Sequence, residues 1–105
     1  MFNDKIATAW STYSSYSAVQ SAAKLVGTNT SYKMHITDII TYSNTIGAIT
    51  FLENTTTTKL VITPNVTGTS LHFHLNTPIV IATNSALHIT TAPTVSSVFL
   101  SGYWT

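Results

Sequence analysis

From Tyr32 onward, apolar and polar residues alternate along the chain with a period of two, and β-branched residues occur throughout. Successive side chains of a β-strand point to opposite faces, so this period is typical of strands with one buried face. The three clearest stretches are residues 32–37, 70–76 and 86–90. Residues 79–81, an Ile-Val-Ile run without polar alternation, are predicted to be covered on both faces.

Five weaker strand candidates complete the pattern, at residues 18–26, 48–53, 59–63, 79–83 and 95–103. Clusters of Ser, Thr, Asn, Gly and Pro separate most of the candidates and indicate turns. Short strands at a spacing of roughly ten residues suggest a sandwich or a barrel. We therefore predict an all-β fold, a jelly-roll sandwich of about eight short antiparallel strands.

The first residues of the chain show neither a clear strand nor a clear helix pattern. Trp10, Tyr13 and Tyr16 fit a helical period in places, but the segment is rich in Ser and Thr and has no charged face. We predict an extended N-terminal arm over residues 1–16 and a jelly-roll domain over residues 17–105.

Charge is scarce in this chain of 105 residues, which has four Lys or Arg residues, three Asp or Glu residues and a net charge of +1. Soluble domains usually carry about a quarter charged residues. So neutral an exterior predicts a homo-oligomer or a surface covered by a partner. The scattered lysines argue against nucleic acid, and no apolar run approaches the ~18 residues of a membrane span, so we predict no membrane partner.

The sharpest cluster of candidate ligands is His72-x-His74, because residues two apart on a strand share a face. Residues 68–74 resemble the start of a cupin metal motif, but the glutamate that should follow is absent from residues 75–79. A metal site also needs a third ligand and an orienting carboxylate. We therefore predict no metal and no cofactor.

All four histidines alternate with core positions and are expected to face away from the apolar layer. We predict His72, His74 and His88 as contacts of an oligomer interface. In a threefold assembly, copies of one such histidine could also meet near the axis.

A nucleophilic triad needs a base oriented by a carboxylate. Asp38 is the only acid near a histidine within a strand pattern, and its separation of three residues from His35 predicts opposite faces. We therefore predict no catalytic residues and no enzymatic activity.

Aromatic residues gather near the chain ends, where they serve either as anchors for a partner or as packing for the domain itself. Both readings stay open for Trp10 and Trp104. The predicted partner-binding residues are Phe2, Ile6, Trp10, Tyr13, Tyr16 and Trp104.

The order of several short motifs resembles the small jelly-roll head decoration, or cement, proteins of tailed bacteriophages. The residues that carry the resemblance are 32–38, 48–53, 76–79, 84–87 and the closing Ser-Gly-Tyr of 101–103. The resemblance implies a homotrimer on the capsid exterior of a virion, bound to the major capsid protein through its arm. It implies no catalytic residues.

Two alternatives remain. One is a receptor- or carbohydrate-binding head domain of a viral fibre or spike, which would use exposed Trp10 and Trp104. The other is a cupin-like metal-binding protein built on His72 and His74.

Overall fold

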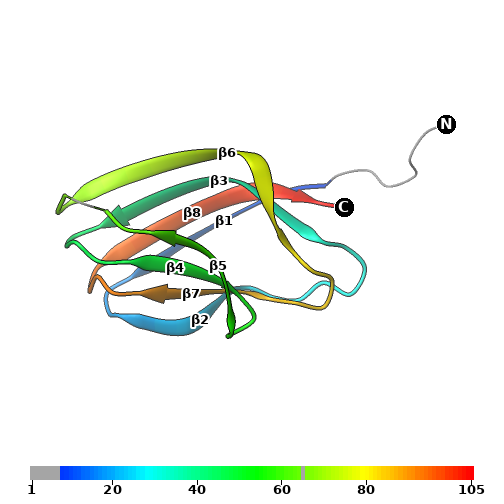
Figure 1. The fold of residues 1–105 in the computed structure, drawn as a ribbon, viewed down its shortest axis with the longest axis horizontal. Helices are drawn as coiled ribbons and strands as arrows, with labels where there is room; N and C mark the ends of the chain where they lie inside the picture. Colours follow the sequence, from blue (N-terminus) through cyan, green and yellow to red (C-terminus); the bar gives the residue numbers. More distant parts are fainter. Residues whose placement is uncertain (1–7, 65) are drawn as a thin grey trace.

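A computed structural model describes residues 8–64 and 66–105 of the chain (Figure 1). These residues form eight β-strands and no helix, and therefore no helix that could span a membrane. The strands are β1 (Thr8–Tyr16), β2 (Gln20–Val26), β3 (Met34–Ser43), β4 (Ile49–Glu53), β5 (Thr57–Ile62), β6 (Thr69–Ile81), β7 (Leu87–Thr91) and β8 (Ser96–Trp104).

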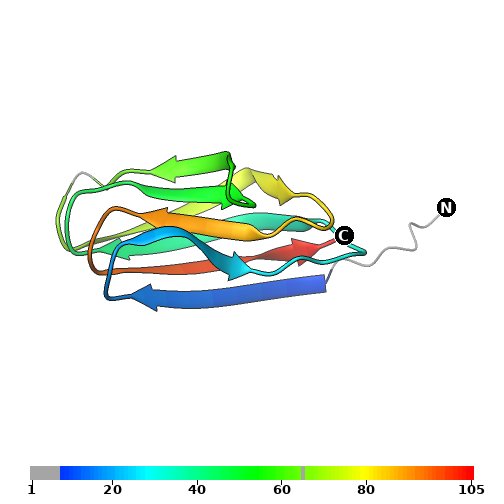
Figure 2. The ribbon, with the colours of Figure 1, turned by 90° about the horizontal axis from the view of Figure 1, so that it is seen from below.

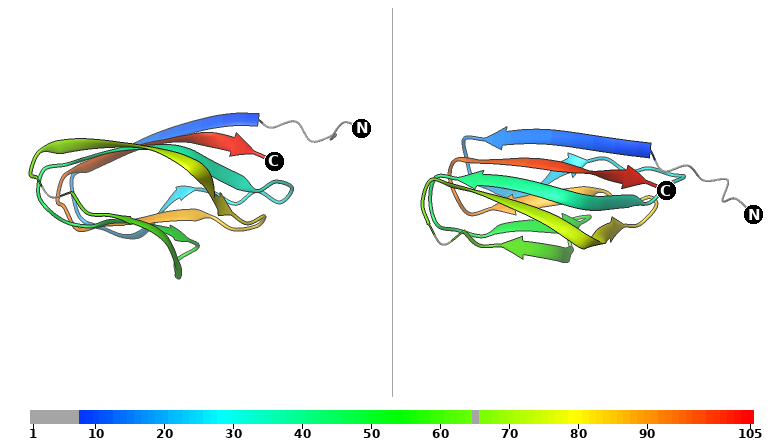
Figure 3. Two further views of the ribbon diagram at one scale, coloured as in Figure 1. Left: turned by 45° about the horizontal axis from the view of Figure 1, so that its top comes forward. Right: turned by 90° about the horizontal axis from the view of Figure 1, so that it is seen from above.

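The strands form two antiparallel sheets that pack face to face, as Figures 2 and 3 show. Sheet A has the order β1-β8-β3-β6 and sheet B the order β2-β7-β4-β5. The first strand thus pairs with the last, the second with the seventh, the third with the sixth and the fourth with the fifth. This is a long hairpin rolled into a sandwich, so the predicted all-β jelly-roll fold is confirmed.

The core lies between the sheets and consists of the apolar residues predicted by the alternation. Sheet A contributes Ile36, Ile39 and Leu100, while sheet B contributes Phe51 and Ile89, all fully buried. Complete burial of one such side chain is worth about 1.5–3 kcal/mol. The opposite face of each strand is thereby left to solvent or to a partner.

The predicted N-terminal arm is wrong for residues 8–16. They form β1, which pairs with β8 along its whole length, from Thr8↔Trp104 to Tyr16↔Ser96. Trp10 and Tyr16 point inward from β1 and pack against the core. The residues between them that also face the core are Thr and Ser. Their polar side chains hid the alternation of apolar and polar residues that is typical of a strand. Residues 1–7 lie outside the described residues.

Two predicted strands, residues 70–76 and 79–83, are replaced by the single strand β6 of 13 residues. Pro78 lies inside β6, which an edge strand tolerates because its free side needs no N–H donor. The prediction that residues 79–81 are covered on both faces is wrong as well. Ile81 is buried, but Val80 is 37% exposed because it lies on the outer face of the edge strand.

Candidate interaction face and its histidine cluster

The outer face of sheet A carries a row of apolar and aromatic residues that crosses β1, β8 and β3 and ends beside His72 on β6. Strand pairing places Tyr13 beside Phe99, Phe99 beside Ile40, and Ile40 beside His72. Tyr13 is 64% exposed and Ile40 is 39% exposed. Tyr42 lies in the next row and is also exposed. Figure 3, right panel, looks onto this sheet. We call this surface the A face.

The two sheets differ sharply in charge. Asp38 is the only Lys, Arg, Asp or Glu residue in the four strands of sheet A. The strands of sheet B contain Lys24, Glu53 and Lys59, the last two 3.7 Å apart as an ion pair. The strands of sheet A are therefore poorer in charged residues than the strands of sheet B.

A β-bulge in β3 puts Asp38 on the A face. Ile36 and Ile39 are both fully buried although they are three residues apart, and the pairing of β3 shifts between Ile36 and Asp38. One extra residue at a bulge changes which residues face outward. The prediction that His35 and Asp38 lie on opposite faces is therefore wrong, and Asp38 pairs directly with His74.

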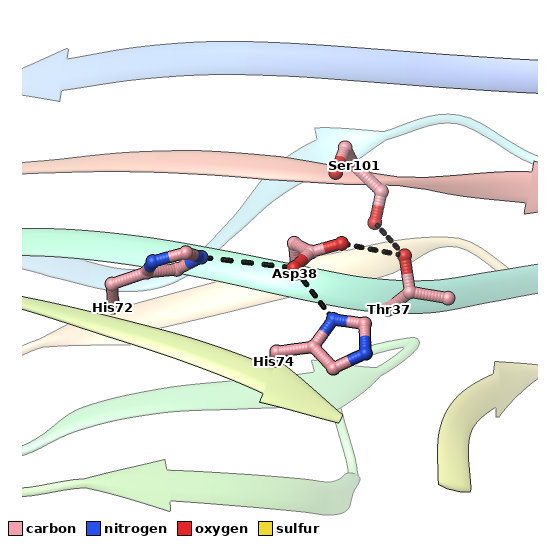
Figure 4. Close-up of polar contacts among 5 residues, drawn as sticks. All are labelled: Thr37, Asp38, His72, His74 and Ser101. Carbon is pink, nitrogen blue, oxygen red and sulfur yellow. Dashed lines mark hydrogen bonds and ion pairs between the residues drawn. The ribbon is translucent and has the colours of Figure 1, made fainter. Parts of the chain in front are cut away.

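Both histidines of the His-x-His motif approach the same carboxylate oxygen, as Figure 4 shows. His74 Nδ1 is 2.9 Å from Asp38 Oδ1, and His72 Nε2 is 3.6 Å from it. A carboxylate only accepts hydrogen bonds, so His74 donates from Nδ1. The Thr37 hydroxyl lies 3.0 Å from Asp38 Oδ2 and 3.3 Å from the Ser101 carbonyl oxygen. We call Asp38, His72 and His74 the histidine cluster.

The hydrogen bonds in the histidine cluster stabilise the charged form of Asp38. The contact from His74, followed by that from Thr37, lowers the pKa of the Asp38 carboxyl below its ordinary value. Asp38 therefore stays ionised across the neutral and mildly acidic range.

The histidine cluster is not a preformed metal centre. The described residues contain no group of three or more His, Cys, Asp or Glu side chains arranged to hold a metal ion. One ring nitrogen of His72 and one of His74 are both directed at the same oxygen, Asp38 Oδ1. Residues 8–64 and 66–105 also contain no pocket that could enclose a small substrate.

His35 lies on the same face but in a different environment. Its ring stacks on Tyr103 with centroids 4.5 Å apart, and its Nε2 lies 2.7 Å from Thr105 Oγ1. Burial, and secondarily the charge of Lys33, lower the pKa of His35 below its ordinary value of 6.5.

We expect the ring C–H signals of His35 to titrate with a midpoint below pH 6.5 in an NMR titration. The unfolded chain binds this proton more readily, so His35 costs folding stability as pH falls below 6.5 toward the lowered pKa. Lys33→Gln should raise the midpoint, because it removes one of the two causes. A midpoint at or above 6.5 in the wild type would contradict this assignment.

The three histidines predicted for an oligomer interface do not share a surface. His72 and His74 lie on the A face, with 61% and 67% of their side chains exposed. His88 lies on β7 of sheet B, beside Lys24 and Leu52, and is only 9% exposed. One flat contact cannot include all three.

Most of the predicted partner-binding aromatic residues pack on their own domain. The rings of Trp10 and Trp104 lie 6.1 Å apart, and both side chains pack against the core, as does Tyr16. Tyr13 alone among the described members of that group is well exposed. Phe2 and Ile6 lie outside the described residues.

Ile40, Tyr42 and Phe99 were not identified from the sequence as surface contacts. Residues 34–43 carry apolar side chains on both faces of one strand, and this was the available signal. An apolar residue that alternates with the core series must lie outside, because the pleat points it there. A comparison of the chain with protein-family models and with curated proteins finds no match.

Proposed function

We propose that this chain is a structural virion protein, a decoration or cement protein. It would bind the outer surface of a phage head as a homotrimer and stabilise the head. It would act without enzymatic activity, through contacts with the major capsid protein. The observation that carries the proposal is the segregation of charge, which leaves a single carboxylate among the strands of sheet A.

The chemistry of the A face favours a neutral protein surface as its partner. Burying charge without compensation is costly, whereas hydroxyl and aromatic groups are buried at smaller cost. Tyr13, Phe99 and Tyr42 are of the residue types enriched in the centres of protein interfaces. The strands of sheet A offer no lysine or arginine to a polyanion such as nucleic acid.

The size of the A face favours attachment in several copies. Four strands about 4.8 Å apart and about nine residues long cover roughly 600 Å² in projection. A standard stable interface buries about 800 Å² on each partner. A trimer that engages a lattice at three points gains affinity through effective concentration, without a larger contact on each subunit.

The test is cosedimentation of the full chain with capsids of the virus that encodes it, at pH 7.5. We expect saturable binding that Ile40→Lys weakens at least tenfold, because the substitution places a charge in the middle of the A face. Val61→Lys is the matched control, since Val61 is 51% exposed on β5 of sheet B. No binding by the wild type, or equal loss in both variants, would contradict the proposal.

The alternative of a carbohydrate-binding head domain makes a different prediction. Trp10 and Trp104 pack against the core, so Tyr13 is the exposed ring that would stack on a sugar. Binding to a glycan array that Tyr13→Ala abolishes, with no binding to capsids, would favour that alternative.

A further inference from the structure

The histidine cluster holds three of the four acidic and imidazole groups that the strands of sheet A contribute to the A face. β3 contributes Asp38 and His35 to this face, β6 contributes His72 and His74, and the other ionisable groups of the four strands are tyrosine phenols. Above the histidine range the four strands therefore carry one negative charge. When both imidazoles of the cluster take up a proton, the net charge becomes positive.

We propose that docking through the A face is linked to protons, so that the contact weakens when both His72 and His74 are protonated. The inference rests on the proposed function and adds the regulation of the same surface. It concerns a contact with capsid protein rather than the folding of the chain itself.

One carboxylate cannot compensate two imidazolium groups. His74 is hydrogen-bonded to Asp38 at 2.9 Å, so its positive charge would be paired. His72 is 3.6 Å from the same oxygen and would leave one positive charge uncompensated. Both side chains are more than half exposed in the free protein, so water stabilises their charges there. Covering the A face removes that water and penalises the charged form.

Proton linkage determines the sign of the effect. A complex that excludes a proton which the free protein binds loses affinity as pH falls, by up to tenfold per pH unit for each proton. His35 contributes less in this range, because burial and Lys33 lower its pKa. Imidazoles are the groups whose charge ordinarily changes between pH 5 and 8.

The experiment measures cosedimentation with the same capsids at pH 7.5, 6.5 and 5.5 and at constant ionic strength. We expect the wild type to lose at least tenfold in affinity between pH 7.5 and 5.5. The double variant His72→Gln with His74→Gln keeps polar side chains of similar size and should vary less than threefold. Titration of groups on the capsid itself changes the affinity of both proteins equally. It therefore cancels in the ratio of the wild-type affinity to the double-variant affinity at each pH.

His35→Gln is the matched control, a histidine on the same face without a carboxylate partner, and it should retain the wild-type pH dependence. Equal wild-type affinity at pH 7.5 and 5.5, or an undiminished pH dependence in the double variant, would overturn the inference and leave the proposed function intact. No docking at pH 7.5 would overturn both.

Discussion

Replacing Gly102 with alanine is expected to lower the free energy of unfolding by about 3 kcal/mol or more, at or above the upper end of overpacking effects. A Cβ atom at Gly102 would lie 1.8 Å from the backbone oxygen of His35 and 3.2 Å from the Ile36 Cα atom. These are backbone atoms of the central strand β3, at the point where its bulge begins. They cannot move aside without breaking the pairing of β3 with β8.

Thermal and urea unfolding of Gly102→Ala measure this effect. For a domain of this size, 3 kcal/mol corresponds to a fall in Tm of about 12–24 °C. Gly27→Ala is the matched control, because a Cβ atom there meets nothing within 4 Å. The control should stay within about 1 kcal/mol of the wild type. A Gly102→Ala protein as stable as the control would show that β8 does not approach β3 so closely.

Replacing Phe51 with alanine is expected to cost about 3–5 kcal/mol, since it removes a fully buried ring from the middle of the core. Phe51 lies on β4 and is the largest of the completely buried side chains. The cavity would lie between the sheets, where the surrounding strands are held by pairing on both sides. Domains of this kind have only about 5–15 kcal/mol of total stability, so the variant should be partly unfolded at 37 °C.

Phe73→Ala removes the same side chain from the edge strand β6, where the ring is 36% exposed. We expect it to cost less than half as much as Phe51→Ala in urea unfolding. Equal losses in the two variants would contradict the placement of the core between β3, β8 and the strands of sheet B.

The histidine cluster shows where a sequence argument fails for a physical reason. The sequence predicted that His72 and His74 share a face, and this follows from the pleat of a strand alone. Asp38 was assigned to the wrong side, because the argument assumed an uninterrupted period through residues 35–38. The phase of the buried residues does change, from even numbers at Met34 and Ile36 to odd numbers at Ile39 and Thr41. The sequence does not show this change, because Ile39 and Ile40 are both apolar and Thr41 is polar.

The first strand shows a second kind of failure. Residues 8–16 contain a period of two, but Ser and Thr occupy both faces and reduce the contrast in hydropathy. Their strand state depends on pairing with the free edge of β8, whose residues lie 80 to 96 positions further along the chain. The pattern within a short stretch of sequence does not show which distant strand will pair with that stretch.

The sequence by itself determined the all-β class, most of the strands and the apolar series that fills the core. These depend on where each side chain points relative to its neighbours along one strand. The tertiary structure alone decided that β1 closes sheet A, that Trp10 and Trp104 pack inward, and that Asp38, the only Lys, Arg, Asp or Glu residue within the strands of sheet A, meets two histidines. Each of these depends on pairing between distant segments, because the partner strand determines both the register and the face that remains uncovered.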